Sequence, residues 1–260
     1  MRKISACIIS YNEEAKIDDC LASLAPVVDE IVVVDSNSTD RTVEIASRYT
    51  KRVIPQAFLG YVAQKQLAIS LATHDWVLVL DCDERVTPEL AESIRSLTES
   101  EDDHSAYEVP RKTFYVYRWL NHCWYPEWRV RLFDRRRCEQ GGTEPHDKVI
   151  VREGSTGRLR GDLLHYSFDS LSGHVRTLNS FTSIAARELV ERRKKVTILT
   201  PFTHAFWICF KLYILRRGFL DGFAGFCVAM LSGVHVFVKY AKVLSYREQV
   251  KRGVRLTGLE

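Results

Sequence analysis

The chain has 260 residues, of which 46% are hydrophobic and 27% are charged, and its formal net charge at pH 7 is +4. This is the balance of an ordinary globular protein, which excludes a disordered chain, and the small net charge argues against a protein that binds nucleic acid with its whole surface. The seven cysteines are scattered without a Cys-x-x-Cys pair, so they favour buried thiols in a reducing compartment over zinc ligands or disulfides.

The first hundred residues alternate apolar runs with segments of helical spacing. Residues 4–10, 30–36, 52–54 and 76–81 predict strands, and residues 12–24, 37–49, 61–72 and 87–97 predict helices, the last with Thr87 as N-cap. The first run is too short for a signal peptide and is followed by two glutamates, so we expect a cytosolic protein. Because the strand runs are continuous rather than alternating, they predict an α/β fold with a mostly parallel sheet and helices on both faces.

The remainder of the chain has a different texture. Residues 107–136 are aromatic and β-prone, which predicts antiparallel or irregular strands, and residues 141–151 predict a turn followed by a strand. From residue 171 the pattern is helical, and the stretch 200–242 is the most apolar in the chain.

Acidic residues stand where the predicted strands end. Asp35 ends the second strand, and Asp81 and Asp83 follow the apolar run of the fourth strand. Ligands bind at the carboxyl ends of parallel strands, and an Asp-x-Asp pair facing one side suits Mg²⁺ or Mn²⁺. The alternative is a solvated strand end. A calcium loop starting at Asp81 is excluded, because Val86 replaces the required glycine and Arg85 replaces a ligand. Arg85 also disfavours a phosphatase-type nucleophile.

Two residues near these strand ends suit a nucleoside. A carboxylate at Asp35 can accept hydrogen bonds from a pyrimidine base or from ribose, and Tyr11, just past the first strand, can stack on the base. The alternatives are that Asp35 caps the following helix and that Tyr11 is a rim aromatic.

Three segments together resemble family 2 glycosyltransferases of the GT-A fold: "IISYNEE" at 8–14, "VVVDSNSTDRT" at 32–42, and "QKQLAISLATHDWVLVLDCDE" at 64–84. The resemblance implies that Asp35 binds the nucleotide base and that Asp81 and Asp83 bind ribose and a divalent metal, Mg²⁺ or Mn²⁺, on the diphosphate of a UDP-sugar. It also implies a catalytic GT-A domain over residues 1–168 and a helical extension over residues 169–260. A nucleotidyltransferase is disfavoured because no glycine-rich loop follows the first strand.

Later stretches are similar to a subgroup of small lipopolysaccharide-core transferases: "WYPEWRVRLFDR" at 124–135, "PHDKV" at 145–149 and "RGFLDGFAGF" at 217–226. The best-known members add β-1,4-glucose from UDP-glucose to an inner-core heptose. The resemblance therefore implies a lipid-linked oligosaccharide acceptor. Alternatives are another lipid-linked glycan as acceptor, or a sugar-nucleotide-binding membrane protein without activity.

Family 2 enzymes invert the anomeric carbon, so one general base must take the acceptor proton. The candidates are Asp147, Glu127 and Glu144. The resemblance of "PHDKV" to the family's step before a strand favours Asp147, although glutamate is expected there and aspartate has a shorter reach. His146 is a candidate to orient the base or to accompany the metal.

Other side chains suit the donor or the acceptor. Arg129 and Arg131 share one strand face and can clamp a diphosphate, and Lys65 can reach the nucleotide. Trp128 belongs to an aromatic group that can stack on a sugar. The alternatives are solvated arginines, a surface lysine and core packing.

The C-terminal segment is basic and aromatic. Residues 222–238 carry no charge, yet Ser232 and His235 interrupt the run, so an amphipathic helix lying in the membrane interface is favoured over a spanning one. The basic residues at 192–195 and 216–217 suit an anionic membrane surface. We therefore expect a peripheral protein on the cytoplasmic face of the inner membrane, with no nucleic acid partner.

Overall fold

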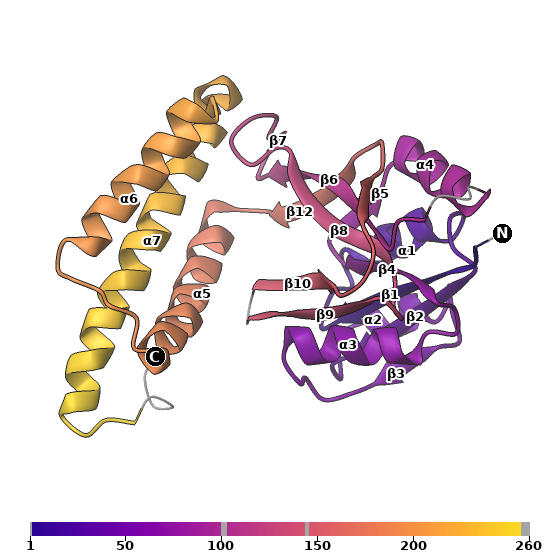
Figure 1. Cartoon of the computed structure of the whole chain (residues 1–260), viewed down its shortest axis with the longest axis horizontal. Helices are drawn as coiled ribbons and strands as arrows, with labels where there is room; N and C mark the ends of the chain where they lie inside the picture. Colours follow the sequence, from indigo (N-terminus) through magenta and orange to yellow (C-terminus); the bar gives the residue numbers. More distant parts are fainter. Residues whose placement is uncertain (1, 100–102, 144–145, 256–260) are drawn as a thin grey trace. The chain divides into compact units, whose positions relative to one another are not determined.

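The computed structural model describes residues 2–99, 103–143 and 146–255. The chain forms two compact units: Met1–Lys112 with Pro126–Tyr166, and Thr113–Tyr125 with Ser167–Glu260 (Figure 1). The sequence-based division at residue 168 did not anticipate that residues 113–125 belong to the second unit.

The first unit is built on a mixed sheet with helices between its first strands. Its elements are β1 Ile4–Ser10, α1 Ile17–Leu24, β2 Glu30–Asp35, α2 Thr42–Ala46, β3 Val53–Pro55, α3 Tyr61–Leu71, β4 Trp76–Asp81, β5 Glu84–Val86, α4 Pro88–Glu99, β6 Ala106–Tyr115, β8 Glu127–Asp134, β9 Cys138–Thr143, β10 His146–Val151, β11 Thr156–Arg158 and β12 Leu163–Phe168. The last residues of β6 and of β12 belong to the second unit.

The strand order of the main sheet is β3-β2-β1-β4-β8-β6-β12-β5, and β9 and β10 form a separate antiparallel pair. Strands β3, β2, β1 and β4 run parallel, which confirms the predicted parallel core, whereas β8 runs antiparallel to β4 and β6. In the parallel part Ser10 lies opposite Asp35, and Ile9 lies opposite Asp81. The carboxyl ends of β1, β2 and β4 therefore meet at one edge.

Alternation along the buried strands places helices on both faces. Ile8 and Leu80 pack in the same cluster as α1, α2 and α4, whereas Cys7 and Val79 pack with α3 on the opposite face. Thr87 accepts a hydrogen bond from the Leu90 N–H, as predicted for the N-cap of α4. Because both faces are covered, the open edge at the strand ends is the place where polar side chains gather.

The second unit contains β7 Arg118–Trp119, α5 Leu171–Glu191, α6 Thr200–Phe210, the π-helix η1 Lys211–Leu215, the 3-10 helix η2 Gly218–Asp221 and α7 Gly222–Lys251. Helix α7 packs against both α5 and α6 (Figure 1). The fully buried carboxylate of Asp221 accepts hydrogen bonds from the backbone N–H groups of Asn121, His122 and Cys123. This contact ties residues 121–123 to the second unit, because an unpaired buried carboxylate would be costly.

Candidate active site

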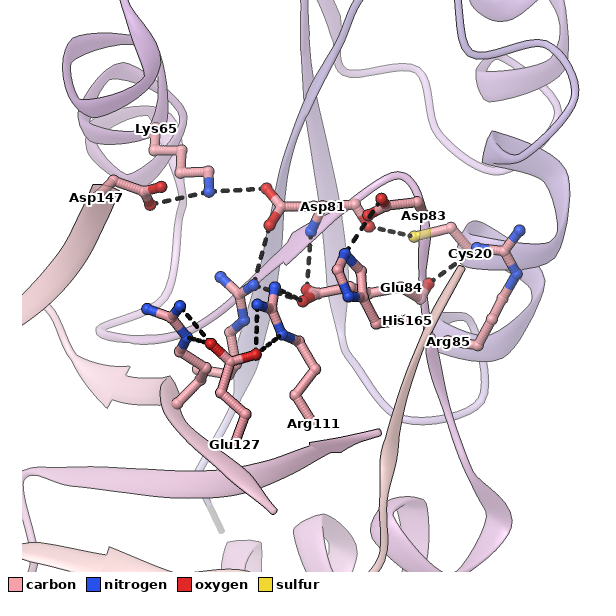
Figure 2. Close-up of polar contacts among 12 residues, drawn as sticks. Cys20, Lys65, Asp81, Asp83, Glu84, Arg85, Arg111, Glu127, Asp147 and His165 are labelled. Atoms are coloured by element: carbon pink, nitrogen blue, oxygen red, sulfur yellow. Dashed lines mark hydrogen bonds and ion pairs between the residues drawn. The ribbon is translucent and has the colours of Figure 1, made fainter. Parts of the chain in front are cut away.

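The Asp-x-Asp pair lies where β4 turns into β5. Asp81 is the last residue of β4, Cys82 and Asp83 form the turn, and Glu84 begins β5. The strand rule that would point both aspartates to one side does not reach Asp83, because the strand ends before it. The turn is held by Arg85, which donates to the carbonyl of Cys82 at 2.9 Å. The two aspartates consequently have different partners (Figure 2).

Asp81 faces two cations. Lys65 Nζ lies 2.7 Å from Asp81 Oδ1, and Arg131 Nη2 lies 2.9 Å from Asp81 Oδ2. Burial alone would raise the pKa of Asp81, but the charges of Lys65 and Arg131 outweigh it and hold that pKa well below its usual range. Asp81 is therefore a carboxylate already compensated by the protein.

Lys65 is 3% exposed, so the alternative of a plain surface lysine does not apply. Its ammonium group also lies 2.9 Å from Oδ2 of Asp147, and a single cation from α3 therefore joins β4 to β10. Gln140 on β9 donates to the same Asp147 oxygen at 2.6 Å. Within the described residues, Oδ1 of Asp147 keeps its acceptor capacity, because both donors use Oδ2.

Glu84, to which the sequence assigned no role, is fully buried beneath this site. It accepts from Arg131 at 2.5 Å, from Arg111 at 3.3 Å and from the Asp81 backbone N–H at 3.1 Å. A buried carboxylate with these donors fixes the guanidinium of Arg131 beside Asp81.

Asp83 meets a histidine that the sequence analysis missed. His165 Nε2 lies 3.3 Å from Asp83 Oδ2, and His165 is brought there because β12 pairs antiparallel with β5. Burial would raise the pKa of Asp83, but the hydrogen bond and charge of His165 outweigh it and lower that pKa. No element was predicted from the sequence for residues 163–168, and nothing local linked His165 to the Asp-x-Asp turn.

The donor set fits a divalent cation that is shared with a substrate. In the part of the chain that the structure describes, no three His, Cys, Asp or Glu side chains gather to hold a metal ion. Asp83 and His165 supply one carboxylate and one imidazole, a set that suits Mn²⁺ or Mg²⁺ when diphosphate oxygens and water complete the shell. Asp81 is less suited, because each of its oxygens already meets a cation. The side chain of His146 lies outside the described residues.

Glu144 and Glu127 are the two other candidate bases, and the structure describes only Glu127. Glu144 lies outside the described residues. Glu127 accepts from Arg111 at 2.6 Å on one oxygen and from Arg129 at 2.5 Å on the other. Burial would raise the pKa of Glu127, but the two arginines outweigh it and lower that pKa, which weighs against Glu127 as a proton acceptor.

Arg129 and Arg131 both lie on β8, where the pairing with β6 shifts register between Val130 and Leu132, and they serve different acids. Arg129 pairs with Glu127, and Arg131 pairs with Asp81 and Glu84. The ring of Trp128 lies beneath the guanidinium of Arg158, 4.4 Å from its centroid, so one face of this ring is already covered.

Asp35 and Tyr11, which were predicted to bind the nucleoside, lie where neighbouring strands end at the same edge of the sheet, but one is buried and the other is exposed. Asp35 is 1% exposed and accepts hydrogen bonds from the hydroxyls of Ser10 and Ser38 and from the Ser38 N–H. These contacts hold the turn after β2 and do not cap α2, whose N-cap is Arg41 and has no side-chain cap hydrogen bond. Tyr11, by contrast, is 60% exposed.

A parallel sheet with the Asp-x-Asp turn at its open edge is the architecture of a GT-A glycosyltransferase. The model of the family described as Glycosyl transferase family 2 matches residues 5–153, more than half of the chain, so the protein is a member of this family.

Relatives of similar length support this assignment. An uncharacterised glycosyltransferase of Rickettsia typhi is 33% identical, with 94% of this chain and 87% of the relative covered. The lipopolysaccharide core biosynthesis glycosyltransferase LpsC of Rhizobium meliloti is 30% identical, with 92% and 91% covered. A solved structure of glucosyl-3-phosphoglycerate synthase from Mycobacterium tuberculosis, in complex with Mn²⁺ and UDP-glucose, is 25% identical over 44% of each chain. Its TM-score with this chain is 0.36.

Proposed function

We propose that the protein is an inverting hexosyltransferase that moves glucose from UDP-glucose to an inner-core heptose of lipopolysaccharide. The observation that carries the chemistry is the single buried lysine between Asp81 and Asp147, because it brings the Asp-x-Asp turn and the proposed base to one site. The similarity to LpsC over 92% of this chain supports the lipopolysaccharide core as acceptor.

The proposed base is Asp147. Lys65 and Gln140 fix its carboxylate through Oδ2, so Oδ1 is the atom that receives the acceptor proton. The acceptor oxygen forms a bond to the anomeric carbon while the bond from that carbon to the diphosphate oxygen breaks. The electron pair leaves with UDP, and attack from the opposite side inverts the configuration.

The leaving diphosphate needs positive charge on the donor side. Lys65 and Arg131 supply two cations beside Asp81, and Glu84 keeps the Arg131 guanidinium in place. Asp83 and His165 would hold the divalent cation, which when bound neutralises charge on the diphosphate. Asp81 acts here through the two cations that it positions, and Tyr11 is the proposed stacking partner of the base.

The acceptor in this proposal is lipid-linked, so the protein works at the cytoplasmic face of the inner membrane. The basic segments of the second unit support a peripheral association with an anionic membrane surface.

The test is UDP release by the purified chain from UDP-glucose with Mn²⁺ or Mg²⁺ and lipopolysaccharide from a strain whose core ends at the heptose. We expect release that depends on the acceptor, and a product with one added β-linked glucose. UDP-galactose and UDP-N-acetylglucosamine serve as donor controls. Faster turnover with either would replace glucose as the donor, and release without product on the core would overturn the acceptor.

A further inference from the structure

The second unit exposes apolar side chains over one continuous stretch of chain. Among the large apolar residues of α6, η1, η2 and α7 that are at least 46% exposed, we call six the aromatic face: Phe202, Phe206, Trp207, Leu215, Phe219 and Phe223. Within α6 only Pro201 is buried. A contiguous exposed patch of large apolar side chains marks a contact with a protein or a membrane, so we expect the aromatic face to meet an apolar partner.

Charge indicates what that partner is. Residues 192–247 contain ten lysines and arginines and a single acid, Asp221. That acid is 0% exposed and accepts hydrogen bonds from the backbone of residues 121–123, so the exposed charged side chains of this segment are all positive. Arg216 and Arg217 lie exposed at the turn between η1 and η2, inside the aromatic face.

Aromatic side chains combined with lysine and arginine fit the headgroup region of an anionic lipid layer. A second copy of the chain is a poorer partner, because it would bring a second set of cations to the same surface. The positive charge of this segment therefore favours an anionic lipid layer as the partner of the aromatic face.

The packing of α7 indicates whether this helix crosses the membrane or stays on one side of it. By length and composition alone, one helical segment in the described chain, Gly218–Lys251, could cross a membrane. However, Lys242 on α7 donates to Asn179, Thr182 and Ser183 of α5. Helix α5 and the residue that follows it carry exposed charge in Glu191 and Arg192, and the half of α7 that packs on α5 faces protein rather than lipid.

We propose that the aromatic face of the α6–α7 hairpin inserts into one leaflet of an anionic membrane without crossing it. Helix α6 and the turn at Arg216 and Arg217 make the lipid contact, while α7 anchors the hairpin to α5. This deepens the peripheral association stated under the proposed function, and it is tested without donor or acceptor, so its failure and that of the catalytic proposal are separate.

The test is flotation of the purified full chain with vesicles of phosphatidylcholine, or of an equal mixture of phosphatidylcholine and phosphatidylglycerol. We expect binding to the mixed vesicles and quenching of Trp207 fluorescence by brominated lipid, with Trp207→Phe losing that quenching. The double variant Phe206→Ser/Trp207→Ser should weaken binding at least about tenfold, because it removes two rings that lie in lipid when the protein is bound to the membrane. Arg216→Gln/Arg217→Gln should weaken binding about tenfold or more and reduce the preference for phosphatidylglycerol.

The matched control is Val175→Ser, which removes an equally exposed apolar side chain of α5 and should leave binding unchanged. Absence of vesicle binding, equal binding to neutral vesicles, or self-association that Phe206→Ser/Trp207→Ser abolishes would each overturn the proposal. Depth is read from Ser245→Cys in a chain with Cys209→Ser and Cys227→Ser, labelled by an impermeant maleimide. Labelling as fast as in solution supports a one-leaflet hairpin, and protection would show that α7 crosses the bilayer.

Discussion

The ammonium group of Lys65 lies 2.9 Å from the carboxylate of Asp147 and donates a hydrogen bond to it. Lys65 is buried, and its other partner is Asp81 at the end of β4. A buried lysine stays charged only when carboxylates compensate it, so helix α3, strand β4 and strand β10 are coupled through one cation.

Replacing Lys65 should therefore destabilise the fold, and the loss should be smaller when one of its carboxylate partners is also replaced. We expect Lys65→Met to lower the free energy of unfolding by about 3 kcal/mol, because it leaves two carboxylates without their shared cation. Asp147→Asn added to Lys65→Met should cost less than the sum of the single changes. Urea unfolding of the four chains measures this coupling. Strictly additive losses would show that the contact is not energetically important, and Arg48→Met, a change in an exposed ion pair, should alter stability by less than about 0.5 kcal/mol.

If Asp147 rather than Glu127 is the base, replacing each of the two residues should affect turnover differently. Asp147→Asn should reduce kcat by about a hundredfold or more with little change in KM for UDP-glucose, because it removes the proton acceptor and keeps the shape. Glu127→Gln should change kcat much less, since both oxygens of Glu127 already serve arginines. Steady-state kinetics of the two variants decide the matter. Near wild-type turnover of Asp147→Asn together with a collapse in Glu127→Gln would reverse the assignment.

The parallel core and its strand ends could be predicted from the sequence, because continuous apolar runs define buried strands whatever lies around them. Asp35 and Asp81 fall at one edge for this reason, and the register with β1 confirms it. The burial of Lys65 could not be predicted in the same way. A helical pattern does not reveal that a lysine faces inward, since a buried lysine is tolerated only where distant carboxylates meet it.

His165 was missed for a related reason. Its contact with Asp83 exists because β12 returns to pair with β5, and such long-range antiparallel pairing leaves no local mark in the sequence. The placement of residues 113–125 in the second unit likewise depends on Asp221, which is far from them along the chain.

If Asp83 and His165 hold the metal ion, each of them should contribute to the affinity for Mn²⁺. In the presence of UDP, His165→Ala should weaken Mn²⁺ binding by about tenfold or more, and Asp83→Asn should weaken it further, because the carboxylate supplies the charge. Calorimetry of Mn²⁺ binding to the UDP-bound chain, after removal of metal by chelator, measures this without turnover. His104→Ala, which alters another histidine of the first unit that contacts Ser155, is the control and should bind Mn²⁺ normally. Unchanged affinity in His165→Ala would remove His165 from the metal site.

His174 predicts a pH dependence of stability in the second unit. Burial lowers its pKa from 6.5 to about 4, and its Nδ1 lies 2.8 Å from the Tyr115 hydroxyl, within a group of aromatic rings that includes Phe168. The unfolded chain takes up a proton at about pH 6.5 while the folded chain stays neutral. Stability is therefore complete above pH 6.5 and falls as the pH drops toward 4, by on the order of 2 kcal/mol.

The variant His174→Gln keeps an acceptor for Tyr115 but cannot titrate, so the difference in unfolding free energy between it and the unchanged chain should shrink between pH 6.5 and 4. Denaturant unfolding at several pH values, with His104→Gln as the matched control, measures that difference. Parallel pH curves for His174→Gln and the unchanged chain would mean that His174 is protonated as easily in the folded state as in the unfolded one. Its place among Tyr115, Trp124 and Phe168 would then be more open to water than the contacts of its ring indicate.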